Sequence, residues 1–333
     1  MEYNVALCTG ADYTVGMGHA IRSSGLLSQL KLNFNLYVLG KGNSLAQFFP
    51  KSICIEIADW SEFAWDAIEI PPLDIVLVDM PFYYDVNWPS LRILGTPLLV
   101  IDDHGGYKPA DIIINGTVLS EYHNYDERCN PTAIYKGPMY SLIRPEFASK
   151  PWQGIDSNTV TILVGSGVES RDWIMAIARI GASQFDAGIV QIVVGRLFDG
   201  INELEGICRE GRFKLHIGVG AASLAEMFSS SAVALVTAGT GLYEAVASGI
   251  PVVSFPQIQD LVKESAWFSE RGACLDLTID CPEPKDAALA VNYLLNDRNA
   301  SILMNKCQSK CLDGRGMVRA ANIIEDILLD KKK

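Results

Sequence analysis

The sequence predicts an α/β protein built from two Rossmann-like domains that face each other across a cleft. Two observations lead to this fold class. The chain has 333 residues, a length typical of about two domains. Short continuous apolar runs alternate with amphipathic stretches, and this alternation restarts near the middle of the chain. Such a pattern is typical of parallel sheets whose two faces are covered by helices.

The first half of the chain carries the first series of strands and helices. A continuous apolar run at residues 5–9 predicts a buried strand, and residues 20–30 predict an amphipathic helix. Further apolar runs predict strands at residues 34–39, 53–57, 74–79, 97–102 and 111–115. Residues 144–158 contain two Pro, one Gly and several polar residues, which indicates a link between domains. We therefore expect the first domain over residues 1–150.

The second half repeats this order of elements. It opens with a predicted strand at residues 160–164 that leads into Gly165-Ser166-Gly167. Further strands are predicted at residues 188–194, 213–217, 232–237 and 251–255, and helices at residues 173–180, 223–229, 241–248, 285–295 and 317–329. We expect the second domain over residues 151–333, with its last helix able to pack back on the first domain.

The charge balance excludes several classes of partner. The chain carries 27 Lys and Arg against 39 Asp and Glu, a net charge of −12. Proteins that bind nucleic acid backbones need a clustered positive surface, so no nucleic acid partner is expected. No apolar run approaches the length of a membrane span, and we expect no signal peptide, because the first residues lead straight into a predicted strand. We expect a cytoplasmic protein, most simply a monomer, although the sequence leaves the oligomeric state open.

The cysteines indicate free thiols in place of a metal site. There are eight Cys and four His, and no CxxC pair occurs. Cys8 and Cys54 lie inside apolar runs, as is typical of buried thiols in a reducing compartment. We expect neither a bound metal nor a cofactor.

The loop after the first predicted strand is a candidate catalytic segment. It contains Gly16-Met17-Gly18-His19, and Arg22 follows on the next helix. Glycines allow a close approach of ligand to backbone, and the helix start offers unpaired N–H groups. At neutral pH, His19 is suited to act as a general base, while the alternative is a histidine that caps the helix or packs in the core. The dinucleotide fingerprint is incomplete here, and no Walker lysine follows a glycine-rich loop.

A second candidate loop lies in the second domain. The predicted strand at residues 232–237 ends in a run of small residues, and a helix with Glu244 in its first turns follows. The loop N–H groups can hold a diphosphate, and the Glu244 carboxylate can accept hydrogen bonds from two ribose hydroxyls. The alternative is an ordinary glycine loop in which Glu244 only complements the helix dipole. The predicted contacts with substrate come from Ala238, Gly239, Thr240, Gly241, Leu242 and Glu244.

Several blocks in this order resemble the nucleotide-sugar hydrolases of the PseG and SpsG type. The first is Gly16-x-Gly18-His19-x-x-Arg22, followed by the paired carboxylates Asp102-Asp103. The segment at residues 137–147, the loop at residues 237–244 and the glycine-rich segment at residues 313–319 match as well. The wider relatives are the two-domain GT-B glycosyltransferases of the MurG type. The resemblance therefore implies a GT-B fold over most of the chain.

The same resemblance implies an activity. These hydrolases cleave the bond between the anomeric carbon and the diphosphate of a UDP-linked amino sugar, with inversion, as in pseudaminic acid biosynthesis. By this comparison, His19 activates the attacking water, and Gly16, Gly18, Arg22 and Asp103 line the sugar side. Glu244 and the backbone of residues 237–242 hold the ribose and diphosphate. The main chain at Ile217 reaches the uracil edge.

Three segments depart from the family pattern and keep alternatives open. Met80-Pro81 stands where the hydrolases have His-Tyr after the strand that ends at Asp79. Residues 165–170 replace a Gly-Gly-x-Asp loop, and Asp260-Leu261 replaces Asn-Gln. The alternatives are a GT-B glycosyltransferase, with an acceptor hydroxyl in place of water, and a catalytically silent nucleotide-sugar binding protein.

Other polar and aromatic residues near the predicted site have two interpretations each. Asp102 and Asp103 either bond the sugar and orient His19, or cap the next element. His104 is either a second base or a surface histidine. The aromatic residues at positions 60, 63 and 65 are expected to pack in the core or on the surface in preference to forming a sugar platform.

Overall fold

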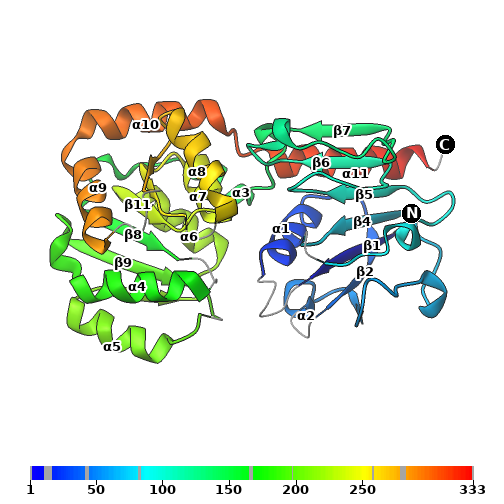
Figure 1. Ribbon diagram of the computed structural model, residues 1–333, viewed down its shortest axis with the longest axis horizontal. Coiled ribbons are helices and arrows are strands. Elements are labelled where there is room, and N and C mark those ends of the chain that lie inside the picture. The colour runs from blue at the N-terminus through cyan, green and yellow to red at the C-terminus, as the bar shows by residue number, and fades with distance from the viewer. Residues whose placement is uncertain are drawn as a thin grey trace. The chain divides into compact units, whose positions relative to one another are not determined.

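The computed structural model describes residues 2–10, 17–41, 45–81, 84–164, 168–196, 198–256, 259–277 and 283–331. The chain divides into two compact units (Figure 1). Unit 1 comprises Met1–Leu142 with Arg315–Lys333, and unit 2 comprises Ile143–Gly314. The first boundary therefore lies eight residues before the predicted one, and the last helix belongs to unit 1.

Unit 1 contains a seven-stranded sheet in the order β3-β2-β1-β4-β5-β6-β7, with every neighbouring pair parallel. From β1 the chain adds β2 and then β3 on one side, and β4 to β7 follow on the other side of β1. The strand order therefore reverses between β1 and β4, as in a Rossmann-type sheet. The strands are β1 Tyr3–Gly10, β2 Phe34–Lys41, β3 Ile53–Glu56, β4 Ile75–Asp79, β5 Leu98–Ile101, β6 Ile112–Asn115 and β7 Ala133–Lys136.

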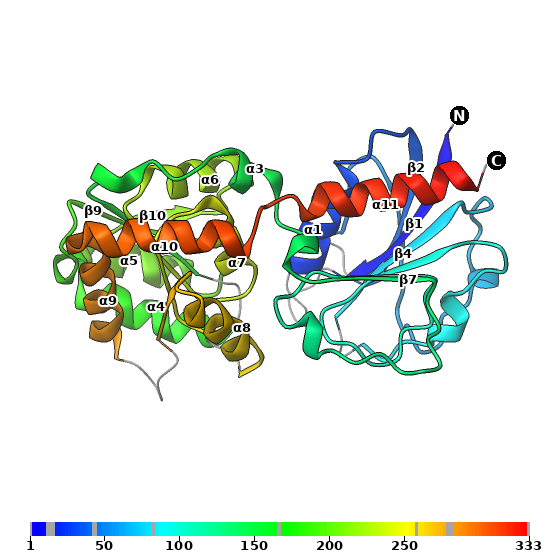
Figure 2. The same cartoon turned by 90° about the horizontal axis from the view of Figure 1, so that it is seen from above.

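Two long helices cover one face of this sheet. They are α1 (Gly18–Leu27) and α11 (Gly316–Asp330), while the short α2 (Leu45–Phe48) follows β2. The views in Figures 1 and 2 show α11, in red, running along the sheet of unit 1. One core cluster joins alternate strand residues to the buried sides of both helices: Val5, Leu7, Ile75, Leu77, Leu99, Ile101, Ala20, Leu26, Leu27, Ala320, Ile324 and Leu328.

Helix α11 lies close against the loop that follows β7. A Cβ atom at Gly316, the first residue of α11, would lie 2.1 Å from the carbonyl oxygen of Ser141. Real Cβ atoms do not approach backbone this closely, so glycine is required at this position. The contact anchors the start of α11 to unit 1.

The opposite face of the sheet carries a second core. Trp60 and Phe63 are buried there with their rings 5.2 Å apart, and Phe63 meets Trp65 edge-on at 5.0 Å. Cys8 and Val78 of the central strands pack against this layer. The expectation that these aromatic residues serve packing is confirmed.

Unit 2 contains a six-stranded sheet in the order β10-β9-β8-β11-β12-β13, again wholly parallel. Its strands are β8 Thr159–Leu163, β9 Ile189–Val194, β10 Lys214–Ile217, β11 Val233–Val236, β12 Val252–Ser254 and β13 Leu275–Asp276. Its helices are α3 Pro145–Ser149, α4 Val168–Ile180, α5 Ile201–Gly211, α6 Ala221–Ser230, α7 Thr240–Ser248, α8 Gln259–Glu270, α9 Pro284–Asn296 and α10 Arg298–Cys311. Two Rossmann-like α/β units are thus confirmed.

Some elements had no signal in the apolar pattern. Strand β7 is an edge strand with only half-buried and exposed residues, and β13 has two residues. Helices α5, α8 and α10 were also not predicted. The buried side of α10 carries Ser301, Met304 and Gln308, and the Gln308 amide donates to the carbonyl oxygens of Ile250 and Ala273. A helix whose buried face is polar shows no apolar period, so this pattern cannot reveal it.

Candidate functional site

The first turn of α1 places His19 over the carboxyl end of β4. His19 Nδ1 lies 2.7 Å from Asp79 Oδ1. The Asp79 side chain is fully buried, whereas one fifth of the imidazole is exposed. Asp79 lies at the reversal of strand order between β1 and β4, where sheets of this type bind ligands.

Two further residues of α1 hold the same carboxylate. Arg22 Nε donates to Asp79 Oδ2 at 2.9 Å, and the Ser23 hydroxyl donates to the same oxygen at 2.7 Å. Arg22 also extends to Asp103, with Nη2 2.7 Å from Asp103 Oδ2. We call His19, Arg22, Ser23, Asp79 and Asp103 the histidine cluster.

The charges in the histidine cluster keep its two carboxylates ionised. Burial acts to raise the pKa of Asp79, but Arg22 and His19 outweigh it, so this pKa lies well below its usual range. Burial also acts to raise the pKa of Asp103, and Arg22 again outweighs it, so this pKa is lowered. Burial acts to lower the pKa of Arg22, but the two carboxylates hold it above its ordinary value.

Asp79 is therefore ionised at neutral pH and can only accept from His19, so the 2.7 Å contact between them corresponds to a hydrogen bond donated by Nδ1–H. Arg22 Nη2 also lies 3.1 Å from this nitrogen. In the neutral tautomer that carries its proton on Nδ1, the lone pair is on Nε2.

Strand alternation explains why Asp79 meets α1. Ile75 and Leu77 point to the face that α1 covers, and Asp79 follows two residues later on the same face. Asp102 and Asp103 were predicted as possible partners of His19, whereas its partner in the structure is Asp79. The signal was present, because Asp79 ends the apolar run directly beside the first strand.

Asp102 belongs to a separate network on the other face of the sheet. Its Oδ2 accepts hydrogen bonds from the Tyr125 hydroxyl at 2.8 Å, from the Gly105 backbone N–H at 2.7 Å and from Asn115 Nδ2 at 3.3 Å. Asp102 is buried. It ties together the loops after β5 and β6, so the two adjacent carboxylates have different surroundings.

His123 contacts this second network. Asn115 Oδ1 accepts from the backbone N–H and the hydroxyl of Thr117, which orients the amide, and Asn115 Nδ2 then lies 3.0 Å from His123 Nδ1. His123 Nδ1 is therefore an acceptor. Burial lowers the pKa of His123, which also favours the neutral ring. His104 is exposed, and its ring centroid lies 6.4 Å from that of His123.

In unit 2, the predicted diphosphate loop joins β11 to α7. Ala238 and Gly239 have φ of +49° and +67°, and Gly239 precedes the first residue of the helix, Thr240. Leu242 is buried within α7. The sharp turn exposes the start of α7 at the carboxyl edge of the sheet, a geometry that suits an anion. Diphosphate binding by Ala238–Leu242 remains a prediction.

Glu244 lies one turn into α7 and forms a two-point ion pair. Its Oε1 lies 2.6 Å from Arg144 Nε, and its Oε2 lies 2.9 Å from Arg144 Nη2. Burial raises the pKa of the Glu244 carboxyl, and Arg144 offsets only part of this effect. The carboxylate is 2% exposed, so a ribose that binds Glu244 must share or displace the arginine. The sequence analysis did not identify Arg144 as its partner.

The remaining predicted residues have mixed outcomes. Ile217 ends β10 and is 39% exposed, so its main chain lies at the carboxyl edge as expected. Gly18 begins α1, and a Cβ atom there would meet nothing within 4 Å. Gly16 and the loop at residues 165–167 lie outside the described residues. Their predicted roles remain predictions.

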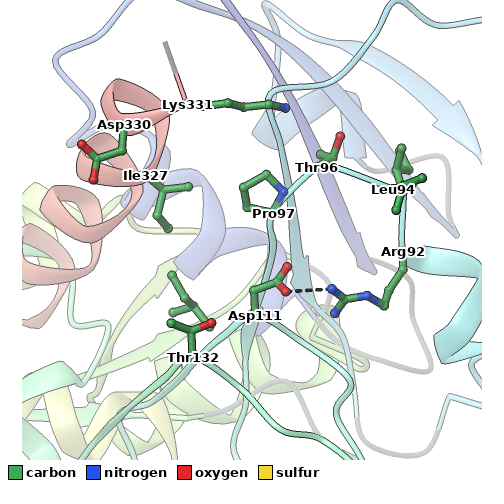
Figure 3. A pocket seen from close by; sticks show the side chains of 12 residues that line it. Arg92, Leu94, Thr96, Pro97, Asp111, Thr132, Ile327, Asp330 and Lys331 are labelled. Carbon is green, nitrogen blue, oxygen red and sulfur yellow. Dashed lines mark hydrogen bonds and ion pairs between the residues drawn. The ribbon is translucent and has the colours of Figure 1, made fainter. Parts of the chain in front are cut away.

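A pocket in unit 1 lies at the other edge of the sheet. It has a volume of about 740 Å³ and is lined by residues before β5, β6 and β7 together with the end of α11 (Figure 3). Arg92 and Asp111 form an ion pair of 2.7 Å in its wall. None of the residues predicted to contact substrate lines this pocket.

Across the ranges that the structure describes, there is no group of three or more His, Cys, Asp or Glu side chains that could hold a metal ion. No helix within the same ranges combines the length and apolar character needed to cross a bilayer.

No protein family model matches the chain. It is 20% identical over 341 residues to the spore coat polysaccharide biosynthesis protein SpsG of Bacillus subtilis, and the alignment covers 97% of this chain and 98% of that protein. This similarity indicates a distant relationship.

Solved structures share the fold over nearly the full length. MurG of Acinetobacter baumannii superposes with a TM-score of 0.63 at 13% identity, covering 97% of this chain and 99% of that one. The calicheamicin glycosyltransferase CalG4 superposes with a TM-score of 0.61 at 15% identity, covering 98% of both chains. The chain therefore has the GT-B fold.

Proposed function

We propose that the protein hydrolyses a UDP-linked amino or deoxy sugar to UDP and the free sugar, with inversion at the anomeric carbon. The observation that carries this proposal is the His19–Asp79 pair, a histidine oriented by a buried carboxylate at the ligand-binding edge of unit 1. The relationship to SpsG supports a role in polysaccharide biosynthesis. We assign the reaction to surface-glycan or pseudaminic-type nonulosonic acid synthesis.

The histidine cluster supplies the proton transfer. Asp79 accepts a hydrogen bond from Nδ1–H of His19, so the Nε2 lone pair can take a proton from water as the water oxygen attacks the anomeric carbon. The bond from that carbon to the diphosphate oxygen breaks, and its electron pair leaves with UDP. The product sugar carries the new hydroxyl, and His19 carries the proton. Asp79 stabilises the imidazolium that forms.

Unit 2 is assigned to the nucleotide. The start of α7 offers backbone N–H groups to the diphosphate, whose negative charge grows as it leaves. Glu244 is assigned to the ribose hydroxyls, alongside Arg144. This assignment needs no metal ion, so activity is expected to persist in EDTA.

Glycosyl transfer is supported equally by the fold. Solved structures that share it include a glycosyltransferase, and the same histidine base can take a proton from an acceptor hydroxyl. The two reactions differ only in the nucleophile. A silent binding protein is less well supported, because binding alone requires no oriented base.

The thiols support the proposed location of the reaction. All seven cysteines in the described ranges are free, which fits a reducing compartment. We therefore assign the protein to the cytoplasm, where it would act as a monomer on a small-molecule substrate.

A panel of UDP-sugars tests the proposal. UDP and free sugar are measured together, with and without candidate acceptors, for the wild type, His19→Asn and His104→Asn. We expect equal amounts of both products from the wild type without acceptor, a loss of roughly 10²–10⁴-fold in His19→Asn, and an unchanged rate in the exposed His104 control. Release of UDP only when an acceptor is present would establish transfer instead.

A further inference from the structure

Arg196 lies at the carboxyl edge of the unit 2 sheet, next to the predicted uracil contact. It follows β9 by two residues, and Gly218 follows β10 directly. The two strand ends are paired, because Ile217 lies opposite Val194 and the Gly218 N–H donates to the Val194 carbonyl oxygen at 2.8 Å. Both residues therefore occupy the edge where sheets of this type bind ligands.

The Arg196 side chain lies across the backbone of Gly218. A Cβ atom at Gly218 would be 2.2 Å from Arg196 Cγ and 2.7 Å from Arg196 Nε. Gly218 also has φ of +64°, a conformation that other residues rarely adopt. The glycine thus permits an approach of the arginine that any other residue would obstruct.

The guanidinium group has no partner within the described part of the chain. No described residue forms a hydrogen bond or ion pair with Arg196, and the side chain is exposed. Carboxylates outnumber basic residues 39 to 27 in this chain, so an arginine without one is notable at a ligand-binding edge. Its five N–H donors in a planar fork are available to a ligand.

We propose that Arg196 recognises the uracil base of the nucleotide by donating hydrogen bonds to a ring carbonyl oxygen. This inference rests on the proposed function and adds a residue that determines base specificity. The diphosphate is assigned to the start of α7 after β11, and β8 separates β11 from β9. Two strand spacings amount to about 10 Å. Ile217, where the base is predicted, ends the strand next to β9, so Arg196 lies closer along the edge to the predicted base than to the predicted diphosphate.

Competition binding of UDP and ADP tests the proposal, because the two share ribose and diphosphate, and adenine has no carbonyl oxygen. We expect Arg196→Met to weaken UDP about tenfold and ADP less than twofold, since hydrogen bonds from a charged donor to a ligand have this effect. Arg196→Lys should lose most of the same factor, because an ammonium group lacks the planar fork. Arg209→Met, an exposed arginine of α5, is the matched control and should bind UDP as the wild type does.

A second variant keeps the test independent of one substitution. Arg196→Ala removes the side chain beyond Cβ and should weaken UDP by the same factor as Arg196→Met, with ADP again changed less than twofold. Melting temperatures measured on the same samples identify any variant that is misfolded. UDP affinity retained by a folded Arg196→Ala variant would contradict the proposed contact.

Two results would overturn this assignment of Arg196 while leaving the proposed function intact. One is UDP affinity unchanged in Arg196→Met, and the other is an equal loss for UDP and ADP, which would indicate a contact with ribose or phosphate. If the wild type does not prefer UDP to ADP, the uridine assignment itself fails, and the role of Arg196 fails with it.

Discussion

The carboxyl edges of the two sheets follow the same strand order but are built from different chemistry. In unit 1 the edge is lined by charged side chains, with Asp79 and Asp103 held by Arg22 beside His19. In unit 2 the corresponding edge is a backbone turn with positive φ at Ala238 and Gly239. Strand order therefore sets where ligands bind, whereas the residues at the strand ends decide what happens there. Proton transfer suits the first edge and anion binding the second.

The largest expected effect separates the two edges directly. Asp79→Asn should lower turnover by roughly 10²–10⁴-fold with UDP affinity nearly unchanged, because an amide can donate to Nδ1 and so favours the wrong tautomer of His19. Steady-state rates and UDP binding are measured on the same protein. Ser23→Ala removes a single hydrogen bond to Asp79 and should reduce turnover far less. A similar loss of UDP affinity in Asp79→Asn would contradict the assignment of proton transfer to unit 1 and of nucleotide binding to unit 2.

The next effect concerns the buried ion pair of unit 2. Arg144→Met should lower the free energy of unfolding by about 3–5 kcal/mol, because it leaves the Glu244 carboxylate buried and unpaired. The double variant Arg144→Met with Glu244→Gln should recover most of this loss. Urea denaturation measures both. A loss below about 1 kcal/mol in Arg144→Met would mean that Glu244 has other support and is free for a ribose.

Acidification should weaken the histidine cluster, because Asp79 becomes protonated. The pKa of Asp79 is lower in the folded than in the unfolded chain, so its stabilising effect is complete above about pH 4 and is lost as the pH falls towards the folded value. Between about pH 5 and pH 2, the wild type should lose on the order of 2 kcal/mol more unfolding free energy than Asp79→Asn. Parallel pH curves for the two proteins would contradict the depressed pKa.

The smallest effect tests whether Gly18 serves the ligand or the fold. The structure leaves open space around this position and gives it no positive φ, so Gly18→Ala should raise stability by about 0.4–1 kcal/mol. If the glycine admits substrate to the start of α1, the same variant should lose substrate affinity. A stabilised variant with normal kinetics would remove Gly18 from the predicted substrate contacts.

Strand alternation shows what the sequence could and could not predict in unit 1. The apolar runs located β1, β4, β5 and β6, because fully buried strands need continuous apolar residues. Successive residues of these runs face opposite sides of the sheet. Asp103 therefore lies on the α1 face with Ile101, and Asp102 lies on the opposite face with Val100. The sequence analysis treated the two carboxylates as one pair. Assigning alternate residues to opposite faces would have separated them, and it would have placed Asp79 on the face that α1 covers.

The partners of Glu244 and Asp102 could not be predicted in this way. Arg144 is 100 residues from Glu244, and Tyr125 is 23 residues from Asp102. No local period encodes such contacts, since they depend on how loops and short helices pack. Arg196 was missed for a related reason: its position is significant only once β9 and β10 are known to end side by side.

The packing of α11 has a consequence for the order in which the chain can fold during synthesis. Unit 2 is a single continuous segment that is complete before α11 is made, whereas the core of unit 1 includes Ala320, Ile324 and Leu328 of α11. On the ribosome, unit 1 must therefore leave part of one face of its sheet, beside α1, uncovered while all of unit 2 is translated. The apolar residues that α11 later covers would be exposed for this interval, and chaperones that bind apolar strands would have their longest opportunity there.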